Sequence, residues 1–162
     1  MNDTALPRTL RADGAGHEPP VDLGLLPGLL GYHLRLAQMA VFEHFAASTA
    51  DLDLSPGLFA ILVIVEANPG LRQTRVAEAA RIDRSTLVPA LDRLEARGLV
   101  ERRAASGDRR SKELFLTDAG SALLGRAKRR VRAHERAIAA SLETEDRTRL
   151  MTLLDALART SA

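Results

Sequence analysis

The stretches that decide the fold are VAEAARIDRSTL at residues 76–87 and LDRLEARGLVER at residues 91–102. The spacing of apolar residues predicts a short amphipathic helix over about residues 72–80, with Val76 and Ala77 on its buried side. After a tight turn, Asp83 is a typical N-cap residue, and Gly98 supplies the positive φ typical of a helix end, so a second helix is expected between them. Two short helices joined in this way are typical of a helix-turn-helix, whose second helix enters the major groove of DNA.

The polar side chains of these two helices are the candidate DNA contacts. A helix N-terminus carries partial positive charge, and the exposed start of the second helix offers one basic and two hydroxyl side chains to the groove. Pro89 is expected to bend that helix, because it cannot donate to the carbonyl of Ser85, and this confines base contacts to the first turn. The predicted contacts are Arg72, Gln73, Thr74, Arg75, Arg84, Ser85, Thr86 and Arg93.

A polar hairpin is expected to follow. Residues 99–103 and 112–116 are predicted to be two short strands joined by a loop over residues 104–111. The basic tip of this loop adds Asp108, Arg109 and Arg110 to the predicted contacts. A helix-turn-helix with such a hairpin indicates a winged helix-turn-helix.

Helical periodicity extends on both sides of this segment. An apolar stripe with a step of three or four residues predicts a helix from Leu23 to about Ala47, and Ser55-Pro56 is a typical start for the next helix. Thr117 and Thr144 are expected to cap two further helices near the C-terminus. The expected order is α-α-α-α-β-β-α-α, a mainly α fold with a small β wing.

The charge distribution favours a phosphate-binding partner. The net charge is only +2, but residues 71–112 hold eleven basic and six acidic side chains, whereas residues 1–70 hold three and eight. A solvated charged face would leave a similar pattern. The absence of cysteine excludes disulfides and thiolate metal sites, and no stretch is long and apolar enough for a signal peptide or a membrane span. A cytoplasmic protein that does not contact membranes is expected.

The helix-turn-helix segment, together with DRRSKELFLTDAG at residues 108–120, resembles the MarR family of bacterial transcriptional regulators. The resemblance implies a homodimer, with residues 23–50 and 118–162 as dimerisation helices around a DNA-binding lobe at 51–117. Residues 1–22, with three Pro and no apolar periodicity, are predicted to be a flexible tail. It also implies that Arg110 enters the minor groove, oriented by Asp108, a site where a guanidinium reads groove shape. Arg72 stands where the family usually has a capping Ser or Thr.

The resemblance implies a ligand-responsive repressor that binds a pseudo-palindromic operator. The alternatives are an activator, or a constitutive architectural DNA binder without a ligand. A winged helix that serves only as a protein-interaction module is disfavoured by the basic segment. A phenolic or aromatic-acid effector is expected in a crevice lined by Tyr32, His33, Leu36 and Phe59, although ordinary core packing would explain the same residues.

Catalytic and metal sites are not expected. His33 and His44 share a helix face but lie about 16 Å apart by helix rise, so they cannot share an ion within that helix. Asp92 and Glu95 are interpreted as i,i+4 partners of neighbouring arginines rather than as catalytic carboxylates. No cofactor is predicted, and an enzyme is disfavoured.

Overall fold

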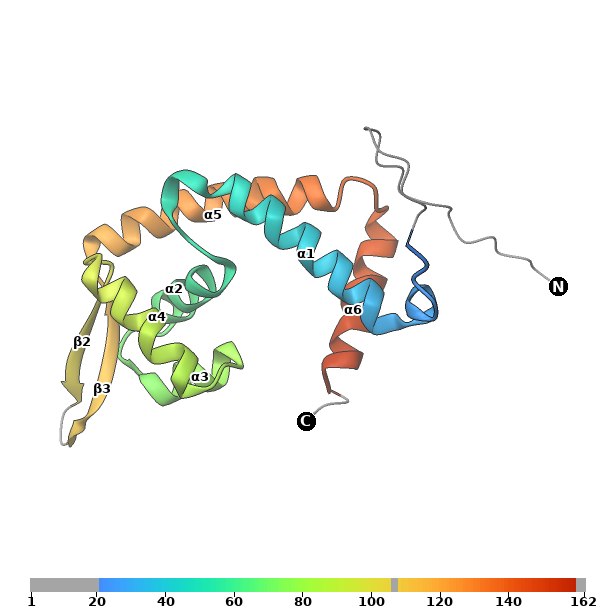
Figure 1. Cartoon of the computed structure of the whole chain (residues 1–162). Coiled ribbons are helices and arrows are strands. Elements are labelled where there is room, and N and C mark those ends of the chain that lie inside the picture. The colour runs from blue at the N-terminus through green and yellow to red at the C-terminus, as the bar shows by residue number, and fades with distance from the viewer. Residues whose placement is uncertain (1–20, 106–107, 160–162) are drawn as a thin grey trace.

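The computed structural model describes residues 21–105 and 108–159, and it describes no side chain between residues 105 and 111. Figure 1 shows a lobe that contains the hairpin and the shorter helices, and an arm of longer helices that extends away from it. The tail predicted at residues 1–22 lies almost entirely outside the described residues.

The element order confirms a mainly helical chain with a small sheet. The two short 3-10 helices are η1 (Leu26–Gly28) and η2 (Ala50–Leu52). The strands β1 (Leu71–Arg72), β2 (Val100–Ala105) and β3 (Asp108–Leu116) form an antiparallel sheet of order β1-β3-β2. The helices are α1 (Leu30–Ser48), α2 (Pro56–Ala67), α3 (Gln73–Ala80), α4 (Arg84–Ala96), α5 (Asp118–Ile138) and α6 (Thr144–Arg159).

The sheet differs from the sequence prediction in two ways. β1 was not predicted: Leu71 pairs with Leu114, and a two-residue strand is too short to show alternation in sequence. The hairpin strands also extend into residues 104–111, which were predicted as loop. Main-chain pairing needs no apolar side chains, so a polar ladder is indistinguishable from a loop in the sequence.

The expected helix starts are confirmed at three of four positions. Ser55 accepts from the N–H of Leu58 at 3.3 Å, and Thr117 accepts from the N–H of Gly120 at 2.9 Å. Asp83 caps α4, and Gly98 has a φ of +64° just beyond its end. The prediction for Thr144 is wrong by one residue, because Thr144 is already the first residue of α6.

One hydrophobic core joins the lobe to the start of α5. α2 is apolar on most sides and is buried at Leu58, Ile61, Leu62 and Val65, as expected of a central helix. Burial of each such side chain stabilises the fold by about 1.5–3 kcal/mol relative to exposure. The inner faces of the helix-turn-helix complete the core with Val76, Leu87, Leu91 and Leu94, together with Leu114 and Leu124 of β3 and α5.

The arm carries much of its apolar surface exposed. The helix predicted from Leu23 begins only at Leu30, after η1, which contains Pro27, and an extended Leu29. α1 lies alongside α5 (Figure 1), while its first turns and α6 line an apolar hollow of about 460 Å³. The hollow is lined by Leu30, Leu34, Leu150, Leu153, Leu154, Ala156 and Leu157.

No helix in the described part of the chain has the length and hydropathy needed to cross a membrane.

Candidate nucleic-acid interface

The turn between α3 and α4 sets the angle of the two helices. Arg81 adopts a left-handed conformation with a φ of +52°, and the N–H of Ile82 donates to the carbonyl of Ala77 at 3.1 Å. A left-handed residue directly after the last helical residue ends the helix abruptly, as in the αL class of helix ends. Arg72 precedes α3 without a side-chain cap, as expected from its departure from the family pattern.

The start of α4 is organised by one carboxylate. Asp83 Oδ1 accepts from the backbone N–H of Thr86 at 2.9 Å and from the hydroxyl of Ser85 at 2.5 Å. These hydrogen bonds, that of Ser85 first, hold the pKa of Asp83 below its ordinary value. The hydroxyl hydrogen of Ser85 is therefore committed to the cap, and the side chains of Arg84, Ser85 and Thr86 are all exposed.

α4 runs without interruption through Pro89, whose side chain is exposed. The apolar side of the helix at Leu87, Leu91 and Leu94 stays fully buried. Pro89 still leaves the carbonyl of Ser85 without its usual helical donor. The restriction of base contacts to the first turn and the bend at Pro89 both stay predictions.

Five of the nine basic side chains that the structure describes in residues 71–112 pair with a carboxylate of the chain. Arg75 binds Glu78 on the same helix at 2.6 Å, and Arg103 binds Glu101 and lies over the ring of Phe115. Arg102 bridges from β2 to Asp92 and Glu95 of α4. These two carboxylates were predicted to pair along their own helix; that prediction is wrong, because strand β2 brings a better-placed cation against them.

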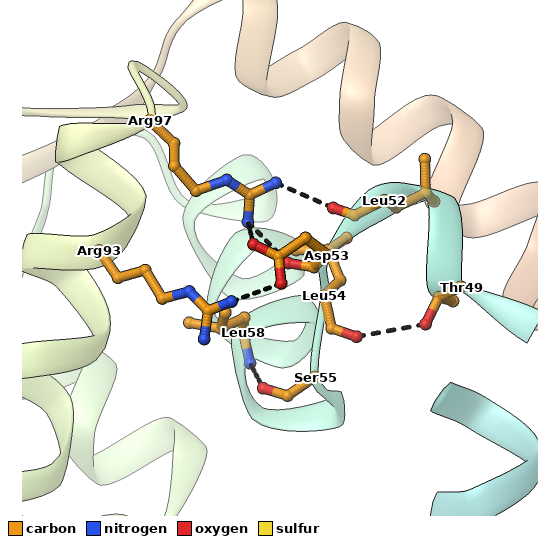
Figure 2. Close-up of polar contacts among 8 residues, drawn as sticks. All are labelled: Thr49, Leu52, Asp53, Leu54, Ser55, Leu58, Arg93 and Arg97. Carbon is orange, nitrogen blue, oxygen red and sulfur yellow. Dashed lines mark hydrogen bonds and ion pairs between the residues drawn. The ribbon is translucent and has the colours of Figure 1, made fainter. Parts of the chain in front are cut away.

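Arg93 and Arg97 reach a segment some forty residues earlier in the chain. Arg93 Nη2 lies 2.5 Å from Asp53 Oδ1, and Arg97 donates to the carbonyls of Asp53 and Leu52 at 2.7 and 2.8 Å (Figure 2). Hydrogen bonding and charge from Arg93, followed by the charge of Arg97, lower the pKa of Asp53. Arg93, predicted as a DNA contact, is thus engaged inside the protein, and its contact with DNA stays a prediction.

Some of the described basic side chains have no carboxylate partner, and most of these lie together. Among the described side chains of residues 71–112, these are Arg72, Arg81, Arg84 and Lys112. Three of them, Arg72, Arg84 and Lys112, line a hollow of about 300 Å³ between the starts of α3 and α4 and strand β3.

Gln73 and Thr74 line the same hollow. The three positive charges fit an anionic group such as a backbone phosphate. Lys112 was not among the predicted contacts; its position opposite Ala104 in the hairpin is what brings it to the helices.

The wing contacts stay predictions. The backbone of Asp108, Arg109 and Arg110 belongs to β3, but their side chains lie outside what the structure describes. Asp108 pairs with Ala105 after an irregularity in the ladder, so all three residues lie at the tip of the hairpin.

The four candidate effector residues do not meet within one chain. Tyr32 and His33 are adjacent, with ring centroids 5.7 Å apart, and His33 donates from Nε2 to the carbonyl of Pro27 at 2.9 Å. Phe59 instead packs against Phe45, thirteen residues further along α1, which is roughly 20 Å by helix rise. Leu36 is exposed between these two groups. A pocket that contains all four residues would therefore need a second chain.

Two histidines form an unpredicted contact between α1 and α5. His44 Nδ1 and His134 Nδ1 are 2.7 Å apart, and His134 is only 2% exposed. Burial, and then the neighbouring His44, lower the pKa of His134. No group of three potential metal-binding side chains occurs within the described residues.

The sequence profile of the MarR family matches residues 54–112, the segment that builds the lobe. A putative transcriptional regulatory protein for the hcr operon of Thauera aromatica is 36% identical over 137 residues, 84% of this chain and 82% of that protein. The chain belongs to the MarR family.

Two solved structures extend the likeness to the whole fold. The transcriptional repressor CouR bound to a 23-mer DNA duplex is 41% identical with a TM-score of 0.81, covering 86% of this chain and 99% of that chain. CouR bound to p-coumaroyl-CoA is 39% identical with the same TM-score and coverage. The predictions of a winged helix-turn-helix and of a DNA-binding transcriptional regulator are therefore confirmed.

Proposed function

We propose that this MarR-family regulator is a homodimeric, ligand-responsive repressor of a pseudo-palindromic operator. Each protomer would place the first turn of α4 in the major groove, so that Arg84 and Thr86 face base edges. The observation that carries the proposal is the hollow beside that turn, where Arg72, Arg84 and Lys112 have no carboxylate partner among the described residues.

The wing and the arm complete the proposal. Arg110, oriented by Asp108, would read minor-groove shape, with Arg109 on phosphate. Residues 23–50 and 118–162 would form the dimer around the lobe at 51–117. A DNA target within the cell places the protein in the cytoplasm, and its regulator relatives give no reason to assign it an enzymatic activity.

Salt dependence tests the hollow directly. Each phosphate contact releases counterions. The slope of log Kobs against the logarithm of the salt concentration therefore becomes more negative by about 0.9 for every contact. We expect Arg72→Gln and Lys112→Gln each to reduce the slope by about 0.9 per protomer, measured by fluorescence anisotropy on duplex DNA. Arg75→Gln is the comparison: Arg75 was also predicted as a contact, but its charge is paired with Glu78, so the slope should change less. An equal loss for Arg75→Gln would contradict a special role for the hollow.

The effector is proposed to be an aromatic acid or its coenzyme A thioester. The support is the relative CouR, whose structure is described with p-coumaroyl-CoA, and the adjacent polar rings of Tyr32 and His33. Thermal stability should rise with p-coumaroyl-CoA or p-coumarate, and the same ligand should release the DNA. Stabilisation by neither would favour the architectural binder without a ligand. DNA release that raises transcription identifies a repressor, whereas release that lowers it identifies an activator.

A further inference from the structure

The segment between α1 and α2 is tied directly to the helix that reads DNA. Asp53 adopts a left-handed conformation with a φ of +47°, and its carboxylate meets Arg93 while its carbonyl accepts from Arg97 (Figure 2). Arg97 also donates to the carbonyl of Leu52. Two side chains one turn apart, in the last turn of α4 and at its C-cap, therefore bind the same short segment. Two points of attachment restrain the direction of a helix, where one would leave it free to pivot.

The same segment is fixed to the arm. The buried hydroxyl of Thr49 lies 2.9 Å from the carbonyl of Phe45 in α1 and 3.2 Å from that of Leu54, and Ser55 caps α2. From the other side, Arg130 of α5 lies 3.4 Å from Asp51. Residues 49–55 therefore form a junction at which α1, α2, α4 and α5 are all attached.

We propose that Asp53 is a positioning residue: through Arg93 and Arg97 it sets the angle of α4 relative to the arm. This inference rests on the proposed function, because in a homodimer that angle determines the distance between the two reading helices. The distance in turn selects operators whose half-sites have a matching spacing. Asp53 acts from the end of α4 opposite the reading turn, and it contacts no DNA itself.

A different role would produce a different result. If Asp53 only neutralised Arg93, its loss would add a positive charge near DNA and strengthen binding to every sequence alike. If it sets the angle, its loss would relax the dependence on half-site spacing. The preference for spacing, rather than overall affinity, is therefore the informative measurement.

Asp53→Asn is the direct test, because asparagine tolerates a left-handed φ and keeps the shape while it removes the charge. The control is Glu101→Gln, which makes the same charge change and releases Arg103, but lies wholly within the lobe. The probes are a duplex selected by the wild-type protein from a random pool, versions of it with one or two base pairs inserted between the half-sites, and a random duplex.

We expect Asp53→Asn to stay dimeric, to bind random DNA no more weakly than wild type, and to lose about tenfold in preference for the selected duplex over the inserted versions. Glu101→Gln should keep the wild-type preference. Arg93→Gln should reproduce the loss, and the double variant should add little to it, since both substitutions break one contact. An unchanged spacing preference in Asp53→Asn and Arg93→Gln overturns the proposal, as does an equal loss in Glu101→Gln. If the wild-type protein selects no sequence from the pool, the proposed function fails, and this inference fails with it.

Discussion

Single residues at the corner between the hairpin and α5 are fixed by close packing. Thr117 donates its hydroxyl to the carbonyl of Gly98 at 2.6 Å and accepts from the N–H of Gly120. A Cβ on Gly120 would lie 2.0 Å from the carbonyl oxygen of Leu99, which is backbone and cannot rotate away. The glycine of the LTDAG sequence is thus required by the approach of α5 to the start of β2.

Gly120→Ala should therefore destabilise the protein, although alanine normally favours a helix. We expect a loss of about 1–3 kcal/mol in the free energy of unfolding, measured by urea denaturation at one protomer concentration. The matched control is Gly125→Ala on the same helix, where the new methyl group meets nothing within 4 Å. That variant should be neutral or gain up to about 1 kcal/mol. Equal behaviour of the two variants would contradict the packing argument.

At the scale of elements, the sequence predicted what depends on neighbouring residues. Helix caps such as Asp83 and the apolar face of α4 are local patterns, and the structure confirms them. The pairing of Leu71 with Leu114 and of Asp53 with Arg93 joins residues some forty positions apart, and no local pattern carries such information. For the same reason the charge count showed that residues 71–112 are basic, but not which cations are already neutralised.

The contact between α1 and α5 should make stability depend on pH. The folded-state pKa of His134 lies below its ordinary value of 6.5, so the unfolded chain binds a proton that the folded chain resists. Stability is therefore complete above pH 6.5, and it falls as pH drops through 6.5 towards the lower folded pKa. Glu135, 4.0 Å from His134 Nε2, partly opposes this shift, whereas Ser48 contacts only His44.

Thermal unfolding between pH 7.5 and 5 measures this dependence. His134→Leu should flatten the decline between pH 6.5 and 5, and the control His33→Gln, at an exposed position, should leave it unchanged. The carboxyls of Asp53 and Asp83, whose pKa values are lowered from 3.8, lose their stabilising contacts only at lower pH. The pH range in which they affect stability therefore lies below the range in which His134 does. A decline of wild-type size in His134→Leu would contradict the assignment to this pair.

On the scale of the whole molecule, the arm is incomplete as a single chain. Leu30, Met39 and Phe42 of α1 are about half exposed, as are Met151 and Leu153 of α6. Exposed apolar faces of this extent on two adjoining helices mark a protein–protein contact surface. In the proposed homodimer a second copy covers them, and the core of each lobe stays independent of that contact.

Leu154→Arg tests this division between lobe and arm. Leu154 is 40% exposed and lines the hollow between α1 and α6, so an arginine there places charge in the proposed interface while the buried core of the lobe is untouched. We expect the mass measured by light scattering to fall to that of a 17.5 kDa protomer, with helical content retained.

Operator affinity should then fall by about 10²–10⁴-fold, because each reading helix binds its half-site without the effective concentration that linkage provides. Thr152→Arg adds the same charge on the opposite side of α6, where the hydroxyl contacts only the carbonyl of Thr148, and it should stay dimeric. If Leu154→Arg stays dimeric and keeps wild-type operator affinity, this face of α6 is not part of the dimer interface. The interface would then be formed by α1 without α6.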